Sequence, residues 1–286
     1  ESGQLQEESF GSIRARAHAG RLGNVLTLSG MPVGSIPVRS GERIRLRLCS
    51  TCNARILQLR FEDLRPRVIA LDGQPVTPYP LAHEMIELAP GQRADLLIDM
   101  TGAPGSTSAV TEVSQSRLVA GQFIYSAEQK LPSRNTALRL PANNLAVPGS
   151  ANLKTVDLVM TGGAMGHLEQ AFHKGKEFTI RELVREHGLV WAFNGVAGMP
   201  DEPLFTAKRG ESVSLRMVND TRWPHAMHFH GHHFRETGGP WRDTLLIGAG
   251  KTKTISFVAD NPGKWMIHCH MLEHQAGGMA TWFAVS

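Results

Sequence analysis

Histidine, cysteine and methionine side chains are concentrated toward the C-terminal end of the sequence. The segment WMIHCHMLEHQAGGM spans residues 265–279, and HAMHFHGHHF spans residues 225–234. Eight of the thirteen histidines lie from residue 225 onward. Imidazole nitrogens and the sulfurs of cysteine and methionine donate lone pairs to soft or borderline metal ions. The composition of these two segments therefore indicates metal binding.

The spacing within each segment sorts these donors onto two faces. Residues i and i+2 of a β-strand lie on one face about 7 Å apart, while residue i+1 points to the other side. His228 and His230 therefore share one face, and His268 and His270 share one face of a second strand. Two such strands side by side would bring four imidazoles together, with Cys269 pointing the opposite way.

The partners available to Cys269 on its own side are His225, His274 and Met279. Two histidines, a cysteine and a weakly bound methionine are the ligands of blue-copper electron-transfer sites. A structural zinc site closes with four ligands in a tetrahedron and has no use for a methionine or for so many histidines. A histidine cluster without metal would leave many polar nitrogens in need of partners. The ligand set therefore favours copper.

Short strands are expected to position these residues. Alternating apolar and polar segments lie between Gly, Pro and Asp turns, a pattern typical of β-sandwiches. The clearest segments cover residues 42–48, 93–100, 121–126, 211–217 and 253–260. Few segments have helical periodicity, so we expect an all-β protein.

An internal repeat indicates two domains of one fold. RSGERIRLRLCST (39–51) aligns without a gap on KRGESVSLRMVND (208–220), and APGQRADLLI (89–98) aligns on GAGKTKTISF (248–257). Residues 140–153, rich in Pro, Asn, Gly and Ser, are typical of a linker. We therefore predict domains at 1–145 and 146–286.

The copper ligands are expected in the second domain alone. The first alignment sets apolar residues of the first domain opposite histidines of the second. The pairs are Ile56 with His225, Leu59 with His228, and Phe61 with His230. The two domains therefore share a fold and differ in chemistry.

Composition and charge give little support to nucleic-acid binding or to a membrane-spanning chain. The chain has 286 residues and a formal net charge of +4, with acidic and basic residues interspersed, so nucleic-acid binding gains little support. It has no run of eighteen apolar residues, which predicts no transmembrane helix. The start, ESGQLQEESF, lacks the basic and apolar regions of a signal peptide, so we expect a processed chain or part of a longer protein.

The two histidine segments resemble the C-terminal copper signatures of the multicopper oxidases, which include laccases, cuprous oxidases and bilirubin oxidases. VIALDGQPV (68–76) and RDT (242–244) also resemble parts of the second and third domains of that family. The resemblance covers the whole chain and implies two cupredoxin-like Greek-key β-sandwich domains. The domain at 1–145 would then be the family's second domain, without copper ligands, and 146–286 its copper-binding third domain.

The resemblance assigns a role to each donor. The type 1 copper ligands would be His225, Cys269, His274 and Met279. His228 would bind the type 2 copper, and the type 3 pair would be bound by His230, His268 and His270. The electron would pass from the type 1 copper through Cys269 into the flanking His268 and His270. His274, at the edge of the site, would be the point where electrons arrive.

The resemblance also implies an activity. One-electron oxidation of a phenolic or aromatic reductant, or of Cu(I), would be coupled to reduction of dioxygen to water at a trinuclear cluster. By analogy with the family the protein would be periplasmic or secreted.

The sequence departs from the family in its remaining ligands. Other members supply four further cluster histidines from two His-x-His motifs in a first domain, and no His-x-His precedes His228. We therefore expect that this sequence lacks the family's first domain. The missing His-x-His motifs would be supplied either by such a domain or by another chain. The alternative is a copper-binding electron-transfer module without oxidase activity of its own.

Two smaller features concern thiols and protons. Cys49 and Cys52 form a C-x-x-C pair for which a disulfide is the leading interpretation and two free thiols the alternative. Gln275 stands where several bacterial relatives carry a proton-delivering glutamate, and a glutamine cannot titrate. Glu273 is a candidate replacement, and the sequence leaves the proton route open.

Overall fold

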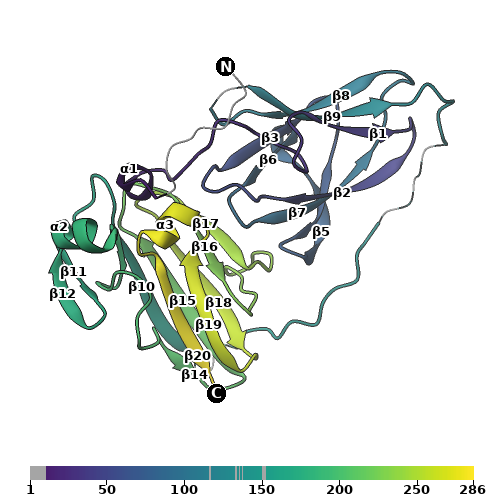
Figure 1. Cartoon of the computed structure of the whole chain (residues 1–286). Helices are drawn as coiled ribbons and strands as arrows, with labels where there is room; N and C mark the ends of the chain where they lie inside the picture. The colour runs from purple at the N-terminus through teal and green to yellow at the C-terminus, as the bar shows by residue number, and fades with distance from the viewer. Residues whose placement is uncertain (1–10, 116, 133, 135, 137, 150–152) are drawn as a thin grey trace. The chain divides into compact units, whose positions relative to one another are not determined.

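The computed structural model describes residues 11–115, 117–132, 134, 136, 138–149 and 153–286. The first ten residues and residues 150–152 of the expected linker lie outside this part. The chain divides into two compact units (Figure 1). Unit 1 contains Gly23–Ser50 and Ile56–Asn143, and unit 2 contains Asn144–Ser286, Thr51–Arg55 and the described residues before Gly23.

Unit 1 contains a five-stranded and a four-stranded sheet. The strands of the five-stranded sheet are, in spatial order, β1 (Gly34–Val38), β9 (Leu118–Tyr125), β8 (Thr107–Glu112), β3 (Leu57–Phe61) and β6 (Met85–Leu88). Those of the four-stranded sheet are β2 (Arg43–Cys49), β7 (Arg93–Asp99), β4 (Arg67–Leu71) and β5 (Gln74–Pro80), and a short 3-10 turn, η1 (Ala82–Glu84), precedes β6. The buried rings of Phe61, Phe123 and Tyr125 belong to the core of this unit.

Unit 2 also contains a five-stranded and a four-stranded sheet, and a two-stranded hairpin in addition. The four-stranded sheet is β13 (Trp191–Phe193), β10 (Lys154–Gly162), β15 (Glu211–Asn219) and β18 (Thr252–Ala259). The five-stranded sheet is β14 (Thr206–Ala207), β20 (Ala280–Val285), β19 (Gly263–Cys269), β16 (His225–Phe229) and β17 (Thr244–Ile247), and the hairpin is β11 (Gln170–His173) with β12 (Lys176–Thr179). The buried ring of Phe257 lies 6.2 Å from the ring of Phe229 and 5.6 Å from the ring of Phe283, centroid to centroid.

The sequence repeat corresponds to one strand pair formed twice. β2 pairs with β7 so that Arg43 lies opposite Asp99. β15 pairs with β18 so that Ser212 lies opposite Val258. Ser212 is 169 residues after Arg43, and Val258 is 159 residues after Asp99. These are the offsets of the first and the second sequence alignment. The aligned segments therefore form equivalent strands in the two units, and the structure shows that these strands pair in the same register.

The helices of unit 2 are short. They are α1 (Ile13–Ala17), α2 (Ile180–Glu182), the π-helical turn η2 (Leu183–His187) and α3 (Leu272–Ala276). No helix in the described ranges is both long and apolar enough to cross a membrane. The all-β prediction is confirmed, since every extensive element of either unit is a sheet.

The disulfide interpretation of the C-x-x-C pair is wrong in this structure. Neither Cys49 nor Cys52 forms a disulfide, and Cys269 forms none either. Cys49 is the last residue of β2 and its side chain is exposed, because the strand alternation turns it outward with Arg45 and Arg47. The structure therefore agrees with the alternative interpretation, in which the two thiols are not joined.

Candidate metal centre

Strands β16 and β19 are antiparallel neighbours and carry most of the candidate ligands. His228 lies directly opposite His268, and Met227 lies directly opposite Cys269. Directly opposed residues of a sheet point to the same face. The histidines and the cysteine are therefore on opposite faces, as the two-residue period predicted.

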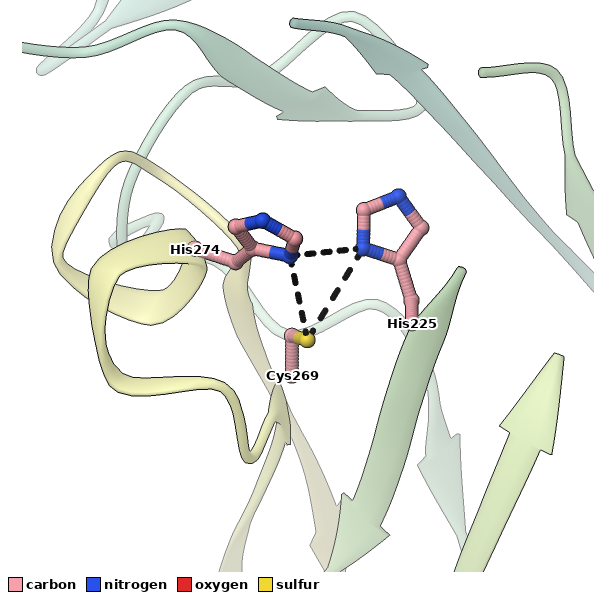
Figure 2. A group of neighbouring side chains, drawn as sticks. All are labelled: His225, Cys269 and His274. Atoms are coloured by element: carbon pink, nitrogen blue, oxygen red, sulfur yellow. Dashed lines mark hydrogen bonds between the residues drawn. The ribbon is translucent and has the colours of Figure 1, made fainter. Parts of the chain in front are cut away.

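Cys269 meets His225 and His274 in a closed group, which we call the Cys269 triad (Figure 2). The Cys269 Sγ atom is 3.8 Å from Nδ1 of His225 and 3.7 Å from Nδ1 of His274. The two Nδ1 atoms are 3.0 Å apart. All three residues are fully buried. They come from the start of β16, the end of β19 and helix α3.

Hydrogen bonds to the outer ring nitrogens orient both imidazoles of the triad. Nε2 of His274 donates to the backbone carbonyl of His18 at 2.7 Å, since a carbonyl oxygen can only accept. Nε2 of His225 lies 2.9 Å from the Thr221 hydroxyl. That hydroxyl donates to the Asn219 side-chain oxygen at 2.7 Å, so it accepts from His225. Neutral rings in these tautomers turn their unprotonated Nδ1 atoms toward the sulfur.

Burial keeps the triad uncharged at neutral pH. Desolvation raises the pKa of the Cys269 thiol to about 12 and lowers the pKa of His274 to about 4. Burial, with His274 as a second cause, holds the pKa of His225 well below its usual value. The lone pairs of the two Nδ1 atoms and of the Cys269 sulfur face one another. A cation bound between them would stabilise this arrangement and would displace the thiol proton. The donor set therefore fits a soft or borderline metal ion.

The Trp191 ring packs against one side of the triad, and Gly163 packs against Trp191. The buried Trp191 ring lies 5.0 Å from the His225 ring and 4.8 Å from the His274 ring, measured between centroids. Gly163 has a φ of 73°, and a Cβ there would come within 2.0 Å of the Trp191 ring. Glycine is required for this close approach. The Met- and Gly-containing segment at 160–173 thus has a packing role.

Met279 follows α3 and is joined to the triad through its backbone. Its N–H donates to the His274 carbonyl at 3.0 Å, and its carbonyl accepts from the Cys269 N–H at 3.1 Å. Its side chain is fully buried. The expected fourth ligand therefore lies beside two triad residues in the backbone network.

The opposite face of the two strands carries a second histidine group, His228, His230 and His268. Nε2 of His230 lies 3.1 Å from Nε2 of His268. The ring of His270 lies 5.5 Å from the His228 ring and 5.6 Å from the His268 ring, centroid to centroid. We call these four residues the histidine face. It reaches solvent, because His230 is exposed and His228 and His270 are half-buried.

Backbone carbonyls fix two rings of the histidine face. Nδ1 of His268 donates to the carbonyl of Cys269 at 2.9 Å, and Nδ1 of His228 donates to the carbonyl of Asp243 at 3.0 Å. Both rings thereby keep Nε2 available as a ligand. Burial lowers the pKa of His268 to about 4 and also lowers the pKa of His230. The lowered pKa values favour the neutral form of His268 and His230, which is the form that binds a metal.

The family profiles identify the chain. Residues 13–128 match a profile described as "Multicopper oxidase", and residues 172–286 match a second profile of the same description. The chain belongs to the multicopper oxidase family. Copper is the metal that this family uses, and the Cys269 triad and the histidine face supply groups that can bind it.

Similar proteins agree with this assignment. "Multicopper oxidase MmcO" of Mycobacterium tuberculosis is 26% identical over 261 residues, covering 86% of this chain and 47% of that protein. "Laccase-5" of Trametes villosa is 25% identical, covering 86% of this chain and 53% of that protein. The multicopper oxidase chain thus spans about half the length of the curated relatives it matches.

A solved structure supports the fold assignment. The crystal structure of a multi-copper oxidase from Pseudomonas thermotolerans has a TM-score of 0.76 and 26% identity, and it covers 96% of this chain and 62% of that chain. The predicted cupredoxin-like fold is therefore confirmed for this multicopper oxidase chain.

Sequence reasoning missed the residues that orient the ligands. Asn219 is buried, and its amide donates to the carbonyls of Trp223, Ile247 and Gly248. Asn219-Asp220-Thr221 also matches the N-glycosylation pattern, but the Asn219 amide is fully buried and is not accessible for that modification. The contact of His18 with His274 had no sequence signal, because 256 residues separate them.

Replacing Thr221 by valine should weaken copper binding in this multicopper oxidase chain. Valine keeps the shape of threonine and removes the acceptor of the His225 Nε2–H. Loss of such an outer partner typically lowers metal affinity about 10- to 100-fold. A copper titration against a competing chelator measures the change, with exposed Thr254→Val on β18 as the matched control. Equal affinities for both variants would show that Thr221 does not orient His225.

Proposed function

We propose that this chain is the copper-binding part of a laccase-like multicopper oxidase. Its type 1 copper ligands are His225, Cys269, His274 and, as a weak fourth ligand, Met279. His228 binds the type 2 copper, and the type 3 ligands are His230, His268 and His270. When bound, copper supplies a one-electron couple and a site for dioxygen reduction. The observation that carries the proposal is the adjacency of the Cys269 triad and the histidine face on β19.

Two routes connect the triad to the histidine face. Cys269 is covalently flanked by His268 and His270, so its backbone leads directly to both. The hydrogen bond from Nδ1 of His268 to the Cys269 carbonyl, at 2.9 Å, adds a second and shorter route. Burial of the triad against Trp191 excludes water, which limits solvent rearrangement when the charge of the site changes. Cys269, His268 and His270 are thus the proposed electron path.

The histidine face is proposed to be completed by ligands from outside the present residues. Family members need eight histidines for the trinuclear cluster, and this face offers four. Unlike the enclosed triad, the face is open to solvent, which leaves room for incoming ligands. A first cupredoxin domain, or another chain with His-x-His motifs, would supply them.

The remaining features of the proposal follow from the family. The reductant is a phenolic or aromatic molecule or Cu(I), and dioxygen is the electron acceptor, so the complete protein is an oxidoreductase. The compartment is the periplasm or the cell exterior. No nucleic-acid or membrane partner is proposed.

The competing function is an electron-transfer module that carries copper and reduces no dioxygen itself. The open histidine face favours it for the chain taken alone, because four histidines do not complete the cluster. The type 1 site and its electron path are the same under both functions.

Copper stoichiometry with an EPR spectrum tests the proposal. About one copper per chain with a type 1 signal only is the result expected for the electron-transfer module. About four per chain with an added type 2 signal, together with oxygen consumption, is expected for the oxidase. Copper binding without any type 1 signal would contradict both functions.

A further inference from the structure

The imidazole of His274 has no access to solvent in this structure. The residue is fully buried, and its outer nitrogen, Nε2, donates to the backbone carbonyl of His18 at 2.7 Å. The resemblance to laccases gave His274 the role of receiving electrons at its ring edge. That edge is occupied by the protein's own backbone, so a reductant cannot contact it directly.

The group that occupies this edge belongs to a segment we call the N-terminal cover, Gly11–Gly20, which includes α1. Four further hydrogen bonds attach the cover to unit 2. Arg16 donates through Nη1 to the Gly188 carbonyl at 2.8 Å and accepts at its own carbonyl from Trp191 Nε1 at 2.7 Å. The Ala17 carbonyl accepts from the Ala164 N–H at 2.6 Å, and the Gly11 N–H donates to Glu273 Oε1 at 3.2 Å.

The contact with Glu273 explains where that carboxyl group points. Glu273 is almost fully buried and accepts from Gly11, so it is an attachment point of the cover. Two ring contacts complete the attachment. The exposed His18 ring packs edge-on against Trp223 with centroids 5.4 Å apart, and Trp191, which holds Arg16, also packs on both histidines of the triad. The cover and the triad thus share Trp191.

The cover depends on these attachments for its stability. α1 has five residues, none of them buried, and a helix of that length is unstable by itself. Its opening free energy is therefore set by few contacts, and loss of one should change it measurably. Arg16 is suited to such a test because its side chain crosses to Gly188, which is 172 residues away in the sequence.

We propose that the N-terminal cover excludes reductants from the His274 ring, and that the electron passes through the His18 carbonyl and its hydrogen bond to His274. The inference rests on the proposed function and specifies how electrons arrive at that site. Copper held by the triad would accept one electron from a phenol docked outside the cover, and the phenol would lose its proton to solvent and leave as a phenoxyl radical. His18 is a positioning residue, because it orients His274 and touches no copper.

Two variants on the same helix separate the role of the cover from general effects. Arg16→Gln removes the bond to Gly188. Arg14→Gln makes the same substitution at an exposed position whose side chain has no hydrogen bond or ion pair within the described part of the chain. Both variants remove one positive charge, so the charge change is matched, and only Arg16→Gln removes an attachment of the cover.

The first measurement is hydrogen exchange of the His274 Nε2–H by ¹⁵N NMR, in the apo chain and in the diamagnetic copper(I) form. Slow exchange is expected in the wild type and in Arg14→Gln. Arg16→Gln should exchange about tenfold faster or more, the factor expected when a hydrogen bond from a charged donor is lost. If the His274 Nε2–H of the wild type exchanges as fast as the N–H of a solvent-exposed imidazole, the proposal is overturned.

The second measurement is the rate at which a reductant bleaches the blue colour, with a methoxyphenol used free and coupled to dextran. In Arg16→Gln the free phenol should react about tenfold faster, because it reaches the ring when the cover opens, while the dextran-coupled phenol should not. Unchanged rates for the free phenol despite faster exchange would overturn the proposal. If Arg16→Gln leaves exchange unchanged, replacement of residues 13–17 by Gly and Ser provides the same two tests.

The two measurements also separate this inference from the proposed function. The exchange experiment on the apo chain needs no copper. A chain with a protected Nε2–H that develops no blue colour with copper would contradict the proposed function, and the apo-chain result would still support the cover.

Discussion

Replacing Cys269 by serine is expected to abolish the blue colour of the copper-loaded chain while leaving the chain folded. The thiolate sulfur supplies the electronic character of a type 1 site, and a hydroxyl oxygen is a hard donor that does not deprotonate under the same conditions. Burial already raises the pKa of the Cys269 thiol to about 12, so the thiol loses its proton at neutral pH only when a metal cation binds to it. A serine in the same place would stay protonated.

Visible absorption and EPR of the loaded variant measure this effect, and thermal unfolding of the apo variant reports the fold. Serine is close to cysteine in size, so the free energy of unfolding should change by about 1–2 kcal/mol at most. Cys49→Ser, at an exposed position in the other unit, is the matched control and should keep the full colour. A Cys269→Ser chain that remains blue would exclude the type 1 assignment.

Replacing Asn219 by alanine should cause the largest loss of stability. The Asn219 amide donates to three backbone carbonyls, and its oxygen accepts from the Thr221 hydroxyl and backbone N–H. Each buried group left without a partner costs about 1–3 kcal/mol, so we expect a decrease of about 3 kcal/mol or more in the free energy of unfolding. The Thr221 hydroxyl would lose its acceptor at 2.7 Å and keep only the Trp223 carbonyl at 3.0 Å, which should loosen its hold on the His225 ring.

Urea denaturation of the apo chain measures the stability change, and a chelator titration of the same variant measures its copper affinity. Asn261→Ala is the control, because the Asn261 amide makes a single long hydrogen bond to the Gly231 carbonyl at 3.2 Å and should cost about 1 kcal/mol or less. Equal losses of stability in the two variants would show that the Asn219 network does not support the site.

Much of this arrangement was predictable from the sequence because it depends on local backbone geometry. The two-residue period of a strand separates Cys269 from His268 and His270 in any sheet. The repeat predicted two domains of one fold, and the aligned segments form the strand pairs β2–β7 and β15–β18, because equal spacing of apolar residues selects equal register. The absence of a disulfide between Cys49 and Cys52 was not predictable, because the sequence spacing of two thiols does not determine the directions of their side chains.

The sequence by itself determined which donors are present, on which side of a strand each lies, and that only the second of two similar domains carries them. The tertiary structure alone decided how the donors are oriented and what surrounds them. Thr221 and the His18 carbonyl select the tautomers of His225 and His274, and the cover closes the site. These contacts join segments with no common periodicity, and they form only when packing brings distant backbone and side-chain groups within hydrogen-bond distance.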